Sequence, residues 1–265
     1  MVEHRDERQA DRRWVRALNV PPGHWKKQLP TKCLAIASKG TVQTLKALLK
    51  ANTEYLNKRG NHGRTLLWEA TRAGNLANVK LLLDAGADAE VTGCYNSETL
   101  VQLSPMCAAI HYKRPTVAAF LKTRTRPHNI FQAAFLGDGP RVKRLLVDNP
   151  RLLNADDEDN EIYFTPPLTF AVAGGHHDVT EQLLDAGADI RSYSAQLFHV
   201  ASGLGRVDLL DLLLTRGADP MAADSSVFVA ARDPVTTQWL LNHGVPVDRV
   251  GTSGFPPLVY LAPGG

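Results

Sequence analysis

A block of leucines followed by Gly-Ala-Asp recurs along this chain and constrains its fold more than any other feature. The stretch NVKLLLDAGADAEV at residues 78–91 returns as VTEQLLDAGADIRS and again as VDLLDLLLTRGADP. The copies align Gly86, Gly187 and Gly217, with Gly244 in LLNHGVPVD as a weaker fourth. Their spacings of 101, 30 and 27 residues fit a unit of about 33 residues, with three units in the first gap. The pattern predicts a chain built from one repeated element.

Two further markers recur in the same order as the glycines and define the repeated element. A small residue on an expected first helix appears as Ala70, Ala109, Ala133, Ala171, Ala201 and Ala230. An apolar pair on the expected second helix runs from Leu48-Leu49 to Leu240-Leu241, with apolar residues at i, i+3 and i+4. Glycine then accepts a positive φ and ends that helix. A single helix pair cannot bury its apolar face alone, so the pairs are expected to stack on one another.

These markers resemble the ankyrin repeat. GRTLLWEATRAGNLANVKLLLDAGAD is similar to the family consensus G-x-T-P-L-H-x-A-A-x-x-G-H, an apolar helix and L-L-x-x-G-A-D, and six other segments match less closely. The resemblance implies an all-α solenoid of stacked helix-turn-helix units with short hairpin-like loops. We expect repeats 1–7 over residues 30–248, with 1–29 as an N-terminal amphipathic helix and linker that caps the first repeat, and 249–265 as a partial eighth repeat.

Departures from the family pattern carry their own expectations. Thr65 is the best remnant of the T-P-L-H box, and Trp68 stands where the family has a histidine that ties adjacent repeats by hydrogen bonds. Its replacement predicts irregular stacking that depends more on apolar packing. Long intervals at 91–105 and 154–167 predict loops that interrupt the regular solenoid.

The two ends of the chain leave alternatives open. Residues 3–19 are read as a cap on the first repeat, or as a basic arm that binds a partner. FPPLVYLAPGG near the C-terminus starts like another first helix, so it is either a half-repeat cap or the beginning of a repeat that continues in a longer protein.

The sequence shows no arrangement of residues that indicates catalysis, a metal or a cofactor. Adjacent His176 and His177 point in different directions at a helix start, and the acidic run at 156–161 lacks the glycine and terminal glutamate of a calcium loop. Three cysteines in no zinc pattern suggest free thiols. The chain has no apolar run of about 18–20 residues for a membrane span and no secretory signal, which favours the cytoplasm and leaves signal-independent export open.

The uneven charge indicates what kind of partner the chain attracts. Residues 1–150 carry a net charge of +12 and residues 151–265 carry −9. We therefore expect another protein that is acidic toward the N-terminal half, bound by a monomer, rather than nucleic acid, since no nucleic-acid-binding module is visible. The resemblance implies binding along a concave groove of hairpin tips and first helices. By alignment, the expected contact residues are Asn61, His62, Arg64, Arg72, Tyr95, Arg114, Tyr163, Thr165, Ser192, Tyr193, Met221 and Arg232.

The function expected from the sequence is therefore a non-catalytic protein-interaction module. Two alternatives stay open. The chain could be a regulatory or targeting segment of a larger enzyme or effector whose catalytic part lies beyond residue 265, or an inhibitor or immunity-type protein. The sequence identifies neither the partner nor the source organism.

The charge gradient predicts that association with the partner depends on salt. Reversing the charges of Arg64, Arg72 and Arg114 should slow association, because a positive surface steers an acidic partner before contact. Stopped-flow association rates measured at low and high ionic strength test this hypothesis. Equal rates at both would contradict it.

Overall fold

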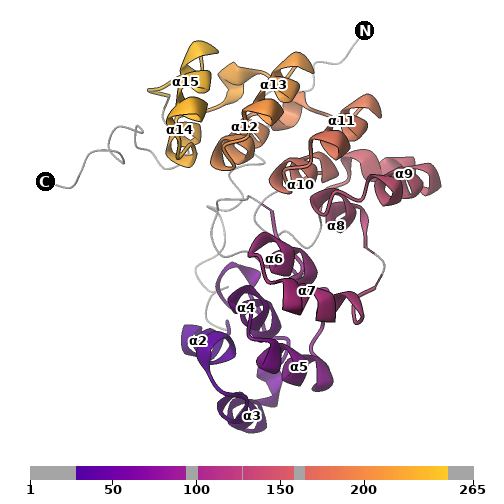
Figure 1. The fold of residues 1–265 in the computed structure, drawn as a ribbon, viewed down its shortest axis with the longest axis vertical. Helices are drawn as coiled ribbons and strands as arrows, with labels where there is room; N and C mark the ends of the chain where they lie inside the picture. The colour runs from indigo at the N-terminus through magenta and orange to yellow at the C-terminus, as the bar shows by residue number, and fades with distance from the viewer. Residues whose placement is uncertain (1–27, 94–100, 127, 158–164, 250–265) are drawn as a thin grey trace, which may run out of the picture. The chain divides into compact units, whose positions relative to one another are not determined.

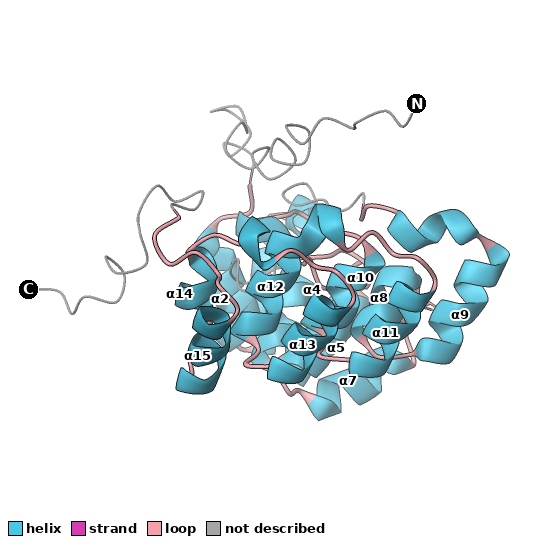
Figure 2. Ribbon diagram, turned by 90° about the horizontal axis from the view of Figure 1, so that it is seen from above, coloured by secondary structure: helices cyan, strands magenta, loops and turns pink. Residues whose placement is uncertain are grey.

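The computed structural model describes residues 28–93, 101–126, 128–157 and 165–249, and these residues form helices joined by turns and loops (Figures 1 and 2). The only pairing of strand type among them is an isolated antiparallel bridge between Gly93 and Leu103. The predicted all-α repeat fold is therefore confirmed. The predicted helix at 3–19, Tyr95, Tyr163 and the partial eighth repeat after residue 249 lie outside the described residues.

Seven helix pairs follow one another in the described part of the chain, each made of a first and a second helix. They are α2 (Thr31–Lys39) and α3 (Val42–Ala51), α4 (Leu66–Ala73) and α5 (Leu76–Asp84), α6 (Pro105–His111) and α7 (Pro115–Lys122), α8 (Ile130–Phe135) and α9 (Gly139–Asp148), α10 (Pro167–Ala173) and α11 (His177–Asp185), α12 (Ser194–Gly203) and α13 (Val207–Thr215), and α14 (Ser226–Ala230) and α15 (Pro234–Asn242). Short 3-10 turns join them at η3 (Thr53–Tyr55), η4 (Asn61–Gly63), η5 (Pro150–Asn154), η6 (Arg191–Tyr193) and η7 (Pro220–Ala222).

The helix pairs form two compact units along the chain. The N-terminal unit contains α2–α7, and the C-terminal unit, from residue 129 onward, contains α8–α15. In each unit, first helices contact the first helices of the next pair and second helices contact second helices, so that each unit has two helical layers (Figure 1). This is the nearest-neighbour stacking expected of a repeat protein.

The leucine-glycine marker forms the second helix and its end as the sequence predicts. Leu82, Leu183 and Leu213 are fully buried between the layers. Gly86 and Gly187, just beyond two of these helices, have φ angles of 91° and 92°, which residues with a β-carbon rarely adopt. The motif therefore specifies both the buried face and the turn that directs the chain to the next pair.

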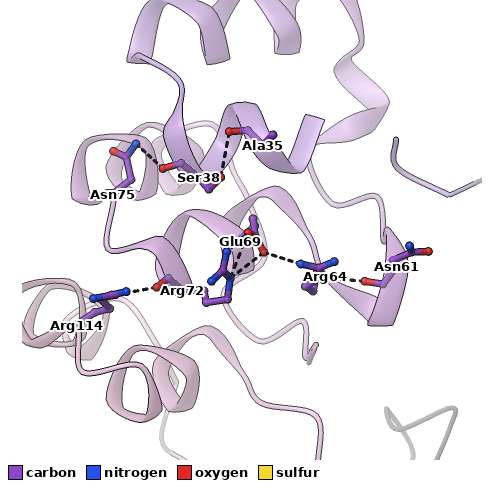
Figure 3. Close-up of polar contacts among 8 residues, drawn as sticks. All are labelled: Ala35, Ser38, Asn61, Arg64, Glu69, Arg72, Asn75 and Arg114. Atoms are coloured by element: carbon purple, nitrogen blue, oxygen red, sulfur yellow. Dashed lines mark hydrogen bonds and ion pairs between the residues drawn. The ribbon is translucent and has the colours of Figure 1, made fainter. Parts of the chain in front are cut away.

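A recurring hydrogen bond also joins successive repeats. The residue just before a second helix extends its side chain to a backbone carbonyl at or just after the end of the first helix of the preceding repeat. Figure 3 shows this bond for Asn75 and for Arg114. The bonds are Asn75 Nδ2 to Ser38 O (3.3 Å), Arg114 Nε to Arg72 O (2.8 Å) and Arg206 Nη1 to Gly175 O (2.8 Å). They satisfy carbonyls that the end of a helix leaves without an internal partner.

Trp68 also links two repeats, which corrects the expectation drawn from its replacement of histidine. The indole is fully buried, and its Nε1 donates to the Leu103 carbonyl at 2.7 Å, from the second repeat to the start of the third. Thr65, the other remnant of the box, caps α4 by accepting from the Trp68 backbone N–H at 3.2 Å. Stacking at this junction therefore includes a polar link as well as apolar packing.

We predict that Trp68→Phe destabilises the protein by about 1 kcal/mol, because the Leu103 carbonyl loses one of its two donors and keeps only the Gly93 N–H. Urea unfolding followed by far-UV circular dichroism measures the loss. The matched control is Trp239→Phe, since Trp239 Nε1 donates to the Asp211 carboxylate, which is exposed to water and can be rehydrated. A loss for Trp239→Phe as large as that for Trp68→Phe would show that the hydrogen bond is not the cause.

Candidate partner-binding surface

A charged cluster lies along α4 in the N-terminal unit. The Glu69 carboxylate accepts from Arg64 Nη1 at 3.1 Å and from Arg72 Nη2 at 2.6 Å, and Arg64 Nε also donates to the Asn61 carbonyl at 3.1 Å (Figure 3). The Glu69 side chain is only 5% exposed, whereas Arg72 is 23% exposed. One carboxylate thus holds two guanidinium groups, and the cluster keeps one excess positive charge.

An aromatic residue from the next repeat extends this cluster. The Tyr112 ring, just after α6, has its centroid 6.0 Å from the Arg72 guanidinium carbon, and it meets the Trp68 ring edge-on at 6.0 Å between centroids. Charge and aromatic surface therefore meet on the first-helix layer between α4 and α6. We call Arg64, Glu69, Arg72 and Tyr112 the α4 cluster.

Sequence reasoning identified the two arginines of the α4 cluster but not Glu69 or Tyr112. The spacing of Glu69 and Arg72, three residues apart on an expected helix, is a signal that could have revealed their ion pair. Tyr112 gave no such signal, because its position beside Arg72 depends on how α6 stacks against α4.

Five of the expected contact residues are exposed. In the N-terminal unit, Asn61 and His62 lie in the turn before α4, and His62 has a left-handed φ of 60°. The pKa of His62 is lowered by partial burial and by the nearby charge of Arg64. In the C-terminal unit, Ser192, Met221 and Arg232 are exposed, with Met221 54% exposed.

The other described residues of the expected set are buried or bound within the fold. Thr165 is fully buried, Arg64 is 9% exposed, and Tyr193 is 8% exposed with its hydroxyl 3.2 Å from Asp156 Oδ1. Arg114 is half-buried and makes the inter-repeat bond to the Arg72 carbonyl. The fold therefore leaves a partner little of the surface of Thr165, Arg64 and Tyr193, whereas Arg72 stays partly exposed.

A histidine and a serine of the C-terminal unit lie within hydrogen-bond distance of each other. His199 Nδ1 lies 3.1 Å from Ser226 Oγ, but Asp224 accepts from the Ser226 backbone N–H rather than from the histidine ring. Burial lowers the pKa of His199, although the Asp224 charge opposes this. A serine nucleophile would need an acid that orients the histidine. In the part of the chain that the structure describes, no three His, Cys, Asp or Glu side chains are grouped to hold a metal.

The stacked helix pairs define a helical-repeat protein. Its repeats are ankyrin repeats: a family model of three ankyrin repeats matches residues 130–224, and a single-repeat model matches residues 62–93. The chain is thus an ankyrin repeat protein, and such repeats form protein-interaction modules.

Two curated relatives align with the chain. Ankyrin repeat protein nuc-2 of Neurospora crassa is 26% identical over 244 residues, which cover 88% of this chain and 20% of nuc-2. Human inversin is 32% identical over 98 residues, which cover 36% of this chain and 9% of inversin. The chain thus spans only a small part of either relative.

Two solved structures match this chain with low superposition scores. The human ASB11 ankyrin repeat domain is 22% identical, with 81% of this chain and 98% of that chain covered and a TM-score of 0.37. A Bdellovibrio bacteriovorus predatory endopeptidase in complex with an immunity protein gives a match of 20% identity, with 71% of this chain and 99% of the other covered and a TM-score of 0.37. Among the described residues, no helix is long and apolar enough to cross a membrane.

We predict that Glu69→Gln destabilises the protein by about 2–3 kcal/mol, because Arg64 and Arg72 are left close together without the carboxylate between them. Chemical denaturation measures this loss. Asp185→Asn is the matched control: it removes a carboxylate from an arginine, Arg216, but Asp185 is 65% exposed. It should cost only a small fraction as much. Equal losses would show that Glu69 has no special structural role.

Proposed function

We propose that this protein is a non-catalytic module that holds a partner protein on its first-helix layer, along the groove that the family resemblance implies. The observation that supports this most directly is the α4 cluster. Glu69 fixes the Arg72 guanidinium beside the Tyr112 ring, next to the exposed turn with Asn61 and His62. Side chains already held in place lose little conformational entropy when a partner binds.

The residue types of this surface suit a protein partner. Arginine and tyrosine are frequent interface anchors because each combines a large contact area with a polar end. The described residues of the N-terminal unit include 14 lysines and arginines but 5 aspartates and glutamates, which supports a partner with an acidic surface there. In the C-terminal unit, Ser192, Met221 and Arg232 supply further exposed contacts.

The proposal also includes the cytoplasm as the location of the protein and a monomer as its binding form. The cysteines support the location. Cys33 and Cys107 are buried free thiols, and burial raises the pKa of Cys107 to about 12, so that this thiol stays protonated and unreactive. Buried unpaired thiols are typical of proteins from a reducing compartment.

Affinity capture from the native source with three baits tests the proposed surface. We expect the unchanged chain to retain a protein partner, and His62→Ala combined with Arg72→Gln to retain at least about tenfold less, because the pair removes an exposed contact and the cluster's most exposed cation. Arg72 serves here because Arg64 is buried and Arg114 bonds the preceding repeat, so the charge reversal of all three arginines expected from the sequence to slow association would also disturb the fold.

The control bait is Lys143→Ala with Arg144→Ala, two exposed cations on the second helix α9, and it should retain the partner as well as the unchanged chain does. Equal retention of the partner by all three baits would show that the partner does not bind at α4. If the unchanged chain retains no protein whose amount rises with the amount of immobilised bait, the proposed function itself is wrong.

A further inference from the structure

The second-helix layer of the N-terminal unit carries exposed cations with almost no acidic partners. On α3, α5 and α7 themselves, four exposed lysines occur with a single carboxylate, Asp84, while Glu54, Asp88 and Glu90 lie in the turns that follow α3 and α5. We call the exposed cations Lys46, Lys50, Lys80, Lys122 and Arg124, the last just after α7, the basic layer. Asp84 lies 3.6 Å from Arg124, and none of the four lysines makes an ion pair with another described residue.

In the equivalent layer of the C-terminal unit, the arginines that flank α13 pair with carboxylates within the fold, whereas Lys143 and Arg144 on α9 are exposed. Arg216 contacts both Glu181 (2.7 Å) and Asp185 (2.5 Å) across α11 and α13. Arg206 pairs with Asp208 at 2.6 Å. Glu181, Asp185 and Asp208 are thus neutralised internally, whereas the four lysines of the basic layer have no ion pair among the described residues.

An aromatic ring lies within the basic layer. Lys80 Nζ lies 5.5 Å and the Arg124 guanidinium carbon 5.2 Å from the centroid of the half-buried Phe120 ring. Two cations from neighbouring repeats are thereby held on one aromatic ring, at a junction where α5 contacts α7. The surface thus offers fixed positive charge and apolar area together.

We propose that the basic layer binds an acidic, extended polypeptide segment that crosses α3, α5 and α7, separately from the first-helix surface. Packed helices lie about 8–10 Å apart, and a chain in the polyproline II conformation advances about 3.1 Å per residue with three residues per turn. In this extended conformation, every third residue lies on the same side, so a segment with a carboxylate at every third residue brings one carboxylate to each successive helix. The inference rests on the proposed function only in taking the partner to be a protein.

This spacing favours a polypeptide over a nucleic acid. One strand of a nucleic acid duplex carries a charge about every 3.4 Å, so two of every three phosphates would lie between the helices without a cation. The α4 cluster attracts such a segment less strongly, because Glu69 neutralises part of its charge and leaves a single excess positive charge.

The test measures fluorescence anisotropy of a labelled twelve-residue peptide, Glu-Ser-Gly repeated, at low and physiological ionic strength. A peptide of the same composition with its glutamates in one block is the spacing control, and an oligothymidylate of equal charge is the nucleic-acid control. We expect the spaced peptide to bind more tightly than both, and more weakly as salt rises.

Chain variants locate the binding. Lys46→Glu with Lys80→Glu should weaken peptide binding about tenfold or more. The matched control Lys143→Glu with Arg144→Glu makes the same change in net charge on α9 and should weaken it less than about threefold. Thermal melts confirm that both remain folded, as expected for exposed positions.

Several results would overturn the inference. They are an equal loss in the two variants, tighter binding of the oligothymidylate, no preference for the spaced peptide, or no peptide binding at low salt. Arg72→Gln distinguishes the two proposals, because it should reduce capture of the native partner and leave peptide binding unchanged. If Arg72→Gln lost peptide binding while Lys46→Glu with Lys80→Glu kept it, the acidic segment would bind the α4 cluster and not the basic layer.

Discussion

Burial of each helix pair against the next is the interaction on which this structure depends. A single pair has an apolar face that it cannot cover, and Leu82, Leu183 and Leu213 become inaccessible only because neighbouring pairs cover them. The polar features follow from this stacking. Side chains such as Asn75 and Arg206 reach the preceding repeat's carbonyls because apolar packing has already brought those groups within hydrogen-bond distance. The α4 cluster likewise requires α6 to bring Tyr112 beside Arg72.

Charge is used differently in the two units. On α4, a carboxylate with little solvent access orders two arginines, so that the charge serves structure as well as recognition. On α11 and α13, Arg216 joins two carboxylates at a solvent-accessible surface. On α3, α5 and α7, the lysines have no such partner among the described residues. Net charge along the sequence does not distinguish these situations, because it does not show which charges the fold itself neutralises.

The repeat fold could be predicted from the sequence, whereas the detailed surface could only partly be predicted. Periodic leucines and the glycine that follows them encode local structure directly, and Gly86 and Gly187 have the predicted backbone conformation. The expectation for Trp68 was wrong because it assumed that only a histidine at this position could form a hydrogen bond between repeats. The indole N–H of Trp68 also donates across the repeat junction. Thr165 and Tyr193 were selected by alignment, but their burial depends on contacts between elements that no local pattern reveals.

The side-chain hydrogen bonds from the residues just before the second helices determine how each unit responds to a pulling force. Each bond spans one junction, as Arg114 joins the third repeat to the end of the second and no further. A pulling force applied to the ends of a unit is therefore resisted by its junctions in series, and the weakest yields while the others hold. A unit built this way lengthens in steps under tension and re-forms from the repeats that remain stacked.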